Sequence, residues 1–458
     1  MRRVAQVMAV VGSWLLFVGL RPRAQSFDAL SFVLGAWNGT VDLGHALFLP
    51  LLRLTALGGE ADSALRCAAG LSALGASLAF ALLIRRIEHG GASPGVAWAL
   101  AGCLAGGTLF FQEAGSIEPT GWTMAFLLAA AEVCDCYAAR PTLGRLALAC
   151  AAFAAALSFH VVSVLALPWL VRLAWRAEPR APAAHLAVLG GFLLAGIGLA
   201  FGLRGALAPA WRYWLGFVPD YAEGFGIELL RHFQRGGSLV GRGAPLLLGL
   251  VLRAAWRMRT RLTRGASDAL LLGAPYLLAF VVFGKPLVGL LMPVLLALTL
   301  FAASAPAARH EVRWILGASV LQLVLTAPQA LEWSRAEDEP REKAARIARY
   351  VPEGAALFAG TLANHFRFYC PGLAVVSLPE IWHRVHALDR GIDPIAVLER
   401  AIAAEKRPSV LSSDGAGFMQ VTLGADLQRM GLNAGKAFFI PEDSRLELYP
   451  LTFPYVGK

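Results

Sequence analysis

The chain has 458 residues, of which 57% are hydrophobic and only 16% are charged, whereas an average soluble domain has about 25% charged residues. Together with a mean hydropathy of +0.58, this excludes a soluble globular protein and a disordered chain. The net charge of +10 does not point to nucleic acid, because the basic excess lies among apolar segments. Residues 1–331 carry 26 Lys and Arg against 15 Asp and Glu, and residues 332–458 carry 15 against 16.

Apolar runs recur along the first 331 residues. A bilayer core about 30 Å thick needs roughly 20 apolar residues per helix, so we predict an α-helical polytopic membrane protein with about eleven transmembrane helices. They centre on residues 4–20, 64–84, 94–111, 119–137, 144–158, 161–175, 185–203, 243–256, 268–284, 286–304 and 313–331. The fifth and sixth form one long run, which we divide at Ser158, Phe159 and His160. No cleavage pattern follows the first run, which we interpret as a retained signal anchor.

Basic residues predict the orientation of these helices. With a cytoplasmic amino terminus, 16 basic residues of the membrane part lie inside and 10 lie outside. The loop RAAWRMRTRLTRG alone carries five Arg, and the positive-inside rule gives such short loops the greatest weight. An odd number of helices then places the carboxyl end outside. We therefore expect a multi-pass protein of the cytoplasmic (inner) membrane.

The composition becomes water-soluble after Trp333. The segment RAEDEPREKAARIARYV predicts a charged amphipathic helix, and the short apolar runs ALFAG, LAVVSL, SVLSS, KAFFI and LELYPL predict strands. The segment DPIAVLERAIAAEKR between two of these runs predicts a further helix. We therefore expect a transmembrane domain over residues 1–333 and an extracytoplasmic soluble α/β domain over residues 334–458.

The predicted topology places several acidic residues on the outer side. Asp28 follows the first helix, at the start of an amphipathic segment that we expect to lie in the interface plane; a helix N-cap is its structural alternative. The short second outer loop, FFQEAGSIEPTGW, carries Glu113 and Glu118, and Pro119 is suited to open the next helix. Glu118 has its own structural alternative, since a carboxylate is favourable at the amino end of a helix.

Histidines and basic residues lie on the same side. His45 precedes an apolar run, His160 lies at the break in the long run, and Lys285 stands in the tight turn FGKPL, at the level of a lipid phosphate group. A long third outer loop places arginines among aromatic residues. These arginines include Arg212, Arg231 and Arg235. A satisfied structural histidine, an interfacial aromatic belt and a snorkelling lysine are the ordinary alternatives.

Three segments resemble the GT-C superfamily, membrane glycosyltransferases that use sugars on a polyprenyl-phosphate lipid. DALSFVLGAWNGTVDLGHALFLPLL is similar to the aspartate and subsequent HPxxxPL pattern of protein mannosyltransferase-like members. SIEPTGWTMAFLLAA looks like the second family acid with its following helix, and ALSFHVVSVLALPWL is similar to a segment before a later helix. The chain departs from the pattern at Ala29, where a second acidic residue is common, and at Ala46, where proline is expected.

The resemblance implies transfer of a sugar from a polyprenyl-phosphate-linked donor to a lipid, glycan or protein acceptor, with inversion at the anomeric carbon. We hypothesise that Asp28 is the general base. Glu118 would orient the acceptor, stabilise positive charge on the sugar, or help Asp28 and His45 to hold a divalent ion. A second group of residues would bind the donor or the acceptor, or would help to hold a divalent cation such as Mg²⁺ or Mn²⁺. This group is His45, Glu113 and His160. A third group would neutralise the lipid phosphate: Lys285, Arg212, Arg231 and Arg235.

Other functions remain open at this point: a polysaccharide polymerase or ligase, a lipid flippase or transporter, and a membrane scaffold without activity. A transporter should carry ionisable residues near the bilayer midplane. Only Glu132 lies deep within a predicted span, near its inner end. The other candidates lie on loops and helix ends, which favours the transferase.

Overall fold

The computed structural model describes most of the membrane part and the core of the carboxyl-terminal part. The described residues are 2–23, 26–38, 45–55, 61–176, 190–191, 234, 237–283, 288–336, 338–381, 400, 405, 407–423, 433–434, 438–440 and 443–452. They form two compact units. The first contains the helices up to Arg335 except α2, and the second contains α2 and the chain from Ala336 onward.

The first unit is a bundle of helices. In chain order these are α1 (Arg2–Gly19), α3 (Phe48–Arg53), α4 (Ala61–His89), α5 (Pro94–Ala105), α6 (Thr108–Gly115), α7 (Thr120–Ala139), α8 (Leu143–Phe159), the 3₁₀ helix η2 (Val161–Ala166), α9 (Leu167–Ala174), α13 (Pro245–Arg257), α14 (Arg264–Phe283), α15 (Val288–Ala303) and α16 (Arg309–Arg335). Ten of the eleven predicted apolar segments are helical. The remaining one, 185–203, lies almost wholly outside the described residues.

Within the described residues, three helices are long and apolar enough to cross a membrane: α4, α7 and α16. Five qualify if each of two bent pairs makes one span. One pair is Pro94–Ala105 with Thr108–Gly115, bent by 72°, and the other is Gly237–Gly243 with Pro245–Arg257, bent by 107°. Shorter apolar helices of 10–17 residues accompany them.

Large apolar side chains are exposed on the outer helices of this unit. Val4, Met8 and Leu15 project from α1, and Trp314 and Val324 project from α16. Water-exposed patches of this extent are unusual in soluble proteins. These surfaces are suited to contact lipid chains.

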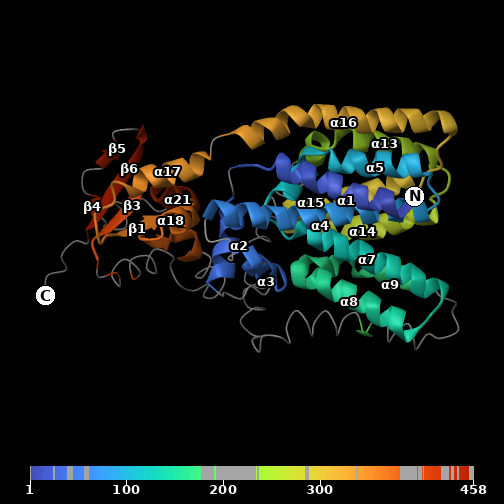
Figure 1. The fold of residues 1–458 in the computed structure, drawn as a ribbon, viewed down its shortest axis with the longest axis horizontal. Helices are drawn as coiled ribbons and strands as arrows, with labels where there is room; N and C mark the ends of the chain where they lie inside the picture. Colours follow the sequence, from blue (N-terminus) through green and yellow to red (C-terminus); the bar gives the residue numbers. More distant parts are fainter. Residues whose placement is uncertain are drawn as a thin grey trace. The chain divides into compact units, whose positions relative to one another are not determined.

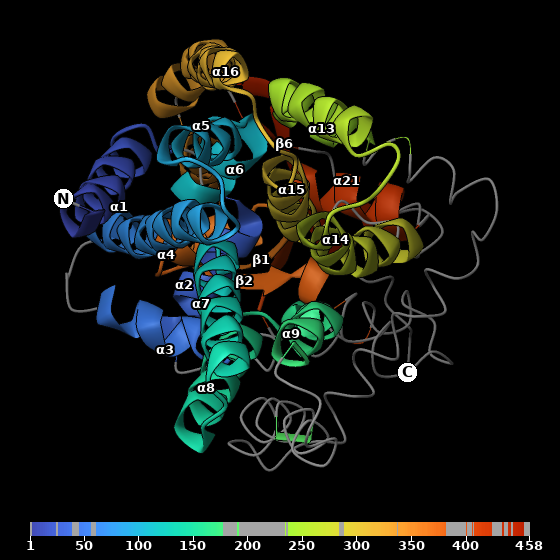
Figure 2. The same cartoon turned by 90° about the vertical axis from the view of Figure 1, so that its right-hand side faces the viewer.

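Small residues let the inner helices approach closely. Helix α4 buries a stripe that includes Ala68, Ser72, Ala76 and Ala79, and it lies between α1 and α7 (Figure 2). Close helix packing through small residues is typical of membrane proteins, because lipid leaves no hydrophobic driving force between helices. Figure 1 shows α16, α13 and α5 running alongside one another elsewhere in the bundle.

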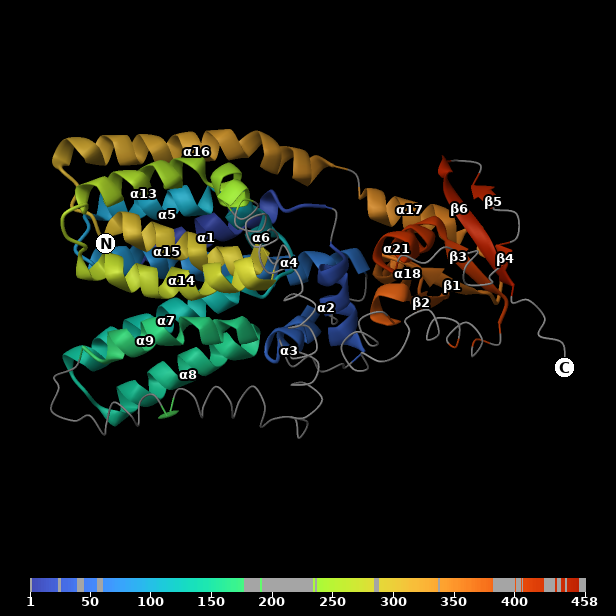
Figure 3. The same ribbon diagram turned by 180° about the vertical axis from the view of Figure 1, so that it is seen from behind.

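The second unit is built on a mixed sheet. Its strands are β1 (Ala356–Ala359), β2 (Ala374–Ser377), β3 (Ser409–Ser412), β4 (Asn433–Ala434), β5 (Phe438–Ile440) and β6 (Asp443–Thr452). The order is β2-β1-β3-β6-β4, with β5 also on β6; β1 is parallel to β2 and β3, and β6 is antiparallel to β3 (Figure 3). All five predicted strand runs are confirmed, whereas β4 was not predicted.

Helices cover this sheet. α17 (Glu339–Ala348) and α18 (Ala363–Tyr369) contribute Ile347 and Phe366 to a core that also contains Leu357 and Val410. Phe358 and Leu411 are paired in the β1–β3 register and alternate with these residues, so they point to the opposite face. α21 (Ser413–Leu423) also packs against the sheet. Burial of all four β1 residues fits a central parallel strand.

Candidate active site

The end of α6 and the turn that follows it hold the two acidic residues of the second predicted outer loop. Glu113 lies on α6, and its carboxylate accepts a hydrogen bond of 3.1 Å from the Thr120 hydroxyl. The backbone N–H of Glu118 donates to the Ser72 hydroxyl of α4 at 3.2 Å. Pro119 is the N-cap of α7, so the helix begins at Thr120, one residue after the predicted start at Pro119. Both side chains are half-buried at one end of the bundle.

A close contact between α4 and α7 fixes this turn. A Cβ atom on Gly121 would lie 2.5 Å from the backbone nitrogen of Ala76, so only glycine permits this approach of the two helices. One residue further, the Trp122 indole N–H donates to the Leu71 carbonyl at 2.9 Å. Glu118 is therefore attached to α4 through its own backbone and through the first turn of α7.

A bend in the chain carries Glu113 to this end. The run 94–111, predicted as one span, breaks at Gly106 and Gly107, where α5 ends and α6 begins. The carbonyl freed at Gly106 accepts hydrogen bonds from Gln322 at 3.4 Å and from Thr326 at 2.5 Å, both on α16. Side chains of a neighbouring helix thus satisfy the break, as bilayer-spanning helices require.

Two predicted site histidines meet in the structure. The rings of His45 and His160 lie edge to face with their centroids 5.0 Å apart, although 114 positions separate them in the sequence. The backbone N–H of Leu47 donates to the Ser158 carbonyl at 2.8 Å and holds the two segments together. The break predicted at residues 158–160 is confirmed, since α8 ends at Phe159 and the Nδ1 atom of His160 accepts from the Val162 N–H at 3.3 Å.

An aromatic stack links the two groups. The rings of Trp122, Phe126 and Phe159 are mutually stacked, with centroid distances of 5.5–6.2 Å. Trp122 and Phe126 lie on the first part of α7, after Glu118, and Phe159 directly precedes His160. The start of α7 and the end of α8 therefore lie at the same end of the bundle. The structure brings Glu113, Glu118, His45 and His160 to that end.

Asp28 lies on α2 (Phe27–Trp37), in the second unit. The N-cap of this helix is Ser26, whose hydroxyl accepts a hydrogen bond from the Ala29 N–H at 3.0 Å. The alternative in which Asp28 is itself the cap is therefore wrong: a serine two residues earlier fills that position. Asp28 is the second residue of the helix, and its side chain lies outside the described structure.

The predicted phosphate-binding residues lie outside the described residues. They are Lys285, Arg212, Arg231 and Arg235. Among the side chains that the structure does describe, no group of three or more His, Cys, Asp or Glu is arranged to hold a metal ion. The predicted roles of Asp28, Glu118 and the histidines stay predictions.

Sequence reasoning missed a charged cluster at the other end of α4 and α7. Glu132, buried on α7, accepts from Arg85 at 3.0 Å and lies 2.9 Å from His89 of α4. One turn further along α7, Asp135 pairs with Arg86. The spacing of Glu132 and Asp135 on one helix face could have indicated such partners, since residues three apart lie on the same face.

Comparison with solved structures identifies the fold. ArnT from Cupriavidus metallidurans bound to undecaprenyl phosphate matches over 97% of this chain and 97% of its own, with a TM-score of 0.55 and 15% identity. Its apo state matches over the same shares with a TM-score of 0.56 and 14% identity. The chain has a GT-C fold. This GT-C fold, with its small carboxyl-terminal sheet, confirms the predicted fold class.

A third structure overlaps in part. The S. cerevisiae protein O-mannosyltransferase Pmt1-Pmt2 complex bound to the sugar donor covers 44% of this chain, which in turn spans 32% of that one, with a TM-score of 0.37 and 17% identity. No family model matches the sequence. No curated protein matches it either.

Proposed function

We propose that this chain is a membrane glycosyltransferase that moves a sugar from a polyprenyl-phosphate-linked donor to an extracytoplasmic lipid, glycan or protein acceptor. The observation that supports it is the end-to-end match with ArnT, one structure of which contains undecaprenyl phosphate. The polar residues gathered at the start of α7 and the end of α8 are consistent with it. They lie at the end of the bundle where α7 begins and α8 ends. In a membrane, a lipid-linked phosphate would meet water at such an end.

In the proposed reaction, the acceptor oxygen attacks the anomeric carbon of the sugar. The bond between that carbon and the phosphate oxygen breaks, and polyprenyl phosphate leaves. Asp28 takes the proton of the acceptor hydroxyl, and attack from the face opposite the leaving phosphate inverts the anomeric centre. Positioned proton transfer of this kind contributes typically about 10²–10⁴-fold to a rate.

Glu118 and the histidine pair have supporting roles in this proposal. Glu118 orients the acceptor or stabilises positive charge that develops on the sugar. His45 and His160 bind the polar edge of donor or acceptor, and their edge-to-face contact gives the two rings fixed positions. Lys285 and the third-loop arginines neutralise the phosphate of the leaving lipid.

The test is transfer in proteoliposomes containing the full chain and radiolabelled undecaprenyl-phosphate sugars. We expect Asp28→Asn to lower transfer by a factor of about 10²–10⁴ while membrane insertion is retained. Asp62→Asn is the matched control, because Asp62 also lies in the first turn of a helix, α4. Unchanged turnover in Asp28→Asn would remove this residue from the mechanism. Transbilayer movement of the labelled lipid without sugar transfer would indicate a flippase and contradict the proposed transferase function.

A further inference from the structure

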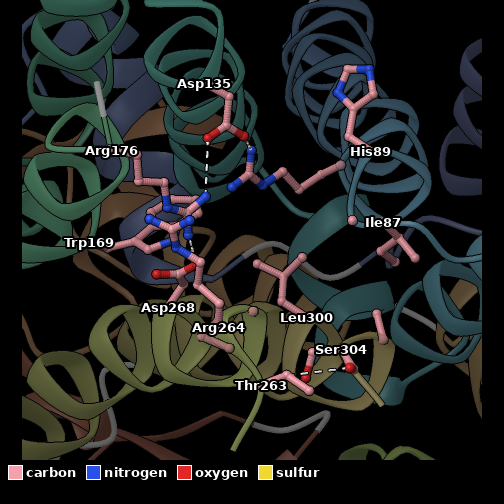
Figure 4. Close-up of a pocket in the computed structure, with 15 residues that line it drawn as sticks. Ile87, His89, Asp135, Trp169, Arg176, Thr263, Arg264, Asp268, Leu300 and Ser304 are labelled. Carbon is pink, nitrogen blue, oxygen red and sulfur yellow. Dashed lines mark hydrogen bonds and ion pairs between the residues drawn. The ribbon is translucent and has the colours of Figure 1, made fainter. Parts of the chain in front are cut away.

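A cavity of about 420 Å³ lies at the charged end of the bundle, among residues of α4, α7, α9, α14 and α15. It is within the first unit and is distinct from the α6–α7 turn, because Arg86 stands 14 residues beyond Ser72 on α4. At 1.5 Å per residue this is about 20 Å. Figure 4 shows Asp135, Arg176, Asp268 and Arg264 gathered on one side of the cavity.

The two aspartates of the cavity are already engaged. Asp135 pairs with Arg86 and lies 3.4 Å from Arg176. Asp268, almost fully buried, pairs with Arg176 and lies 3.3 Å from Arg172. Arg176 therefore bridges α7 and α14 through both carboxylates. Neither aspartate is available to neutralise a further cation.

The cavity nevertheless contains more positive charge than these pairs use. Three arginines, Arg86, Arg176 and Arg264, line it against two aspartates, and Arg86 also lies 3.9 Å from Glu132, which is outside the lining. In the part of the chain that the structure describes, Arg264 forms no ion pair. The Nε atom of Arg176 is buried without a hydrogen-bond partner there, and a buried donor in this state costs free energy until it acquires an acceptor.

The arginines also act on one another. Burial lowers the pKa of the Arg176 guanidinium; Asp135 opposes this, and Arg264, Arg86 and Arg172 lower the pKa further. The same crowding favours an added anion, because it would reduce repulsion among several guanidinium groups at once. Planar guanidinium groups match the oxygens of a phosphate well.

The floor of the cavity is apolar. Trp169 is 1% exposed, and the Arg86 guanidinium lies 5.8 Å from its ring centroid. Ile87 and Leu300 also line the cavity. Basic pockets between membrane helices, with apolar walls, are typical sites for lipid phosphate groups.

We propose that this cavity binds a phosphate-bearing anion, held by Arg264, Arg176 and Arg86 over the Trp169 floor. The anion completes the charge balance that the two aspartates leave unfinished, and it joins α14 to α4 and α9. The phosphate belongs to an anionic lipid head group or to a soluble phosphate compound. This site is independent of the proposed sugar transfer.

The experiment uses the purified full chain in a non-ionic detergent. Phosphatidylglycerol is titrated in mixed micelles and counted by native mass spectrometry, and inorganic phosphate is titrated separately by thermal shift. Arg264→Gln should weaken binding on the order of tenfold, as loss of one charge-assisted contact predicts, and Arg264→Lys should restore part of it. Arg261→Gln is the matched control: Arg261 is exposed, as Arg264 is, and lies three residues earlier, but it does not line the cavity.

The outcomes separate the two sources of phosphate. Binding of phosphatidylglycerol alone, sensitive to Arg264, supports a lipid head group, and binding of inorganic phosphate with the same sensitivity supports a soluble ligand. If neither probe binds, the arginines and aspartates of the cavity serve only as ion pairs that join the helices, and the proposal fails. An equal loss in Arg264→Gln and Arg261→Gln would also overturn it, because this would indicate a diffuse basic surface.

Discussion

Replacement of Gly121 by alanine tests the packing that positions the candidate site. The new Cβ would lie 2.5 Å from the backbone nitrogen and 2.9 Å from the Cα of Ala76. These are backbone atoms of α4, so the clash is relieved only by moving one helix away from the other. Overpacking of this kind costs about 1–3 kcal/mol, and the backbone contact places Gly121→Ala toward the upper part of that range.

Gly144→Ala is a suitable control. Gly144 also lies in a helix, α8, and a Cβ there would meet nothing within 4 Å. Because both variants exchange glycine for alanine in a helix, the helix-propensity gain of about 0.5–1 kcal/mol largely cancels between them. Their difference in stability is then the packing cost alone.

The assay is thermal denaturation of both variants in the same detergent, followed by transfer activity in proteoliposomes. We expect Gly121→Ala to have the lower apparent melting temperature. We also expect lower transfer, since Glu118 is held to α4 one turn away through Ser72. Equal melting temperatures for Gly121→Ala and Gly144→Ala would refute the close α4–α7 contact on which this reasoning rests.

Two further predictions concern buried carboxylates. Glu132→Gln should lower the free energy of unfolding by about 1–2 kcal/mol, rather than the roughly 3–5 kcal/mol of a fully buried pair, because Arg85 is 45% exposed and Arg86 keeps Asp135. The measurement is the apparent melting temperature, which should fall; unchanged melting would contradict the prediction. In the second unit, burial raises the pKa of Asp414 despite its hydrogen bonds. The folded state therefore favours the protonated carboxyl, and this preference adds to the free energy of unfolding. The contribution is fully present below the ordinary aspartate pKa and is lost as the pH rises through the raised pKa of the folded state. Asp414→Asn should flatten that dependence, measured by hydrogen exchange of β1 and β3 between pH 4 and 7; an unchanged slope would assign it elsewhere.

The sequence predicts the helices of the membrane part well, because a span requires only a sufficient length of apolar residues. It also predicts the break at His160, where polar residues interrupt an apolar run. The bend at Gly106 was not predicted. Two adjacent glycines are compatible with a continuous membrane helix, and the side chains that satisfy the freed carbonyl, Gln322 and Thr326, come from more than 200 residues later.

The sequence predicts the chemical types of the site residues better than it predicts which of them contact one another. His45 and His160 were each singled out alone, and only the tertiary structure shows that their rings touch. Asp28 follows the first helix and lies on a short helix, as predicted, but the sequence did not indicate that this helix belongs to the compact unit that contains the sheet. Within that unit, Trp37 of α2 packs on Phe368 of α18, with ring centroids 5.1 Å apart.

The charge distribution along α4 and α7 explains why the arginine-lined cavity escaped prediction. The arginines of α4, α9 and α14 were all assigned to orientation, which requires only their number on each side of the membrane. Orientation does not require that Arg176 reach two buried aspartates on different helices. Ionisable groups that cost desolvation energy are kept where they pair or bind something. Ion pairs with arginines neutralise Asp135 and Asp268. The guanidinium donors that these pairs leave unused favour binding of a phosphate.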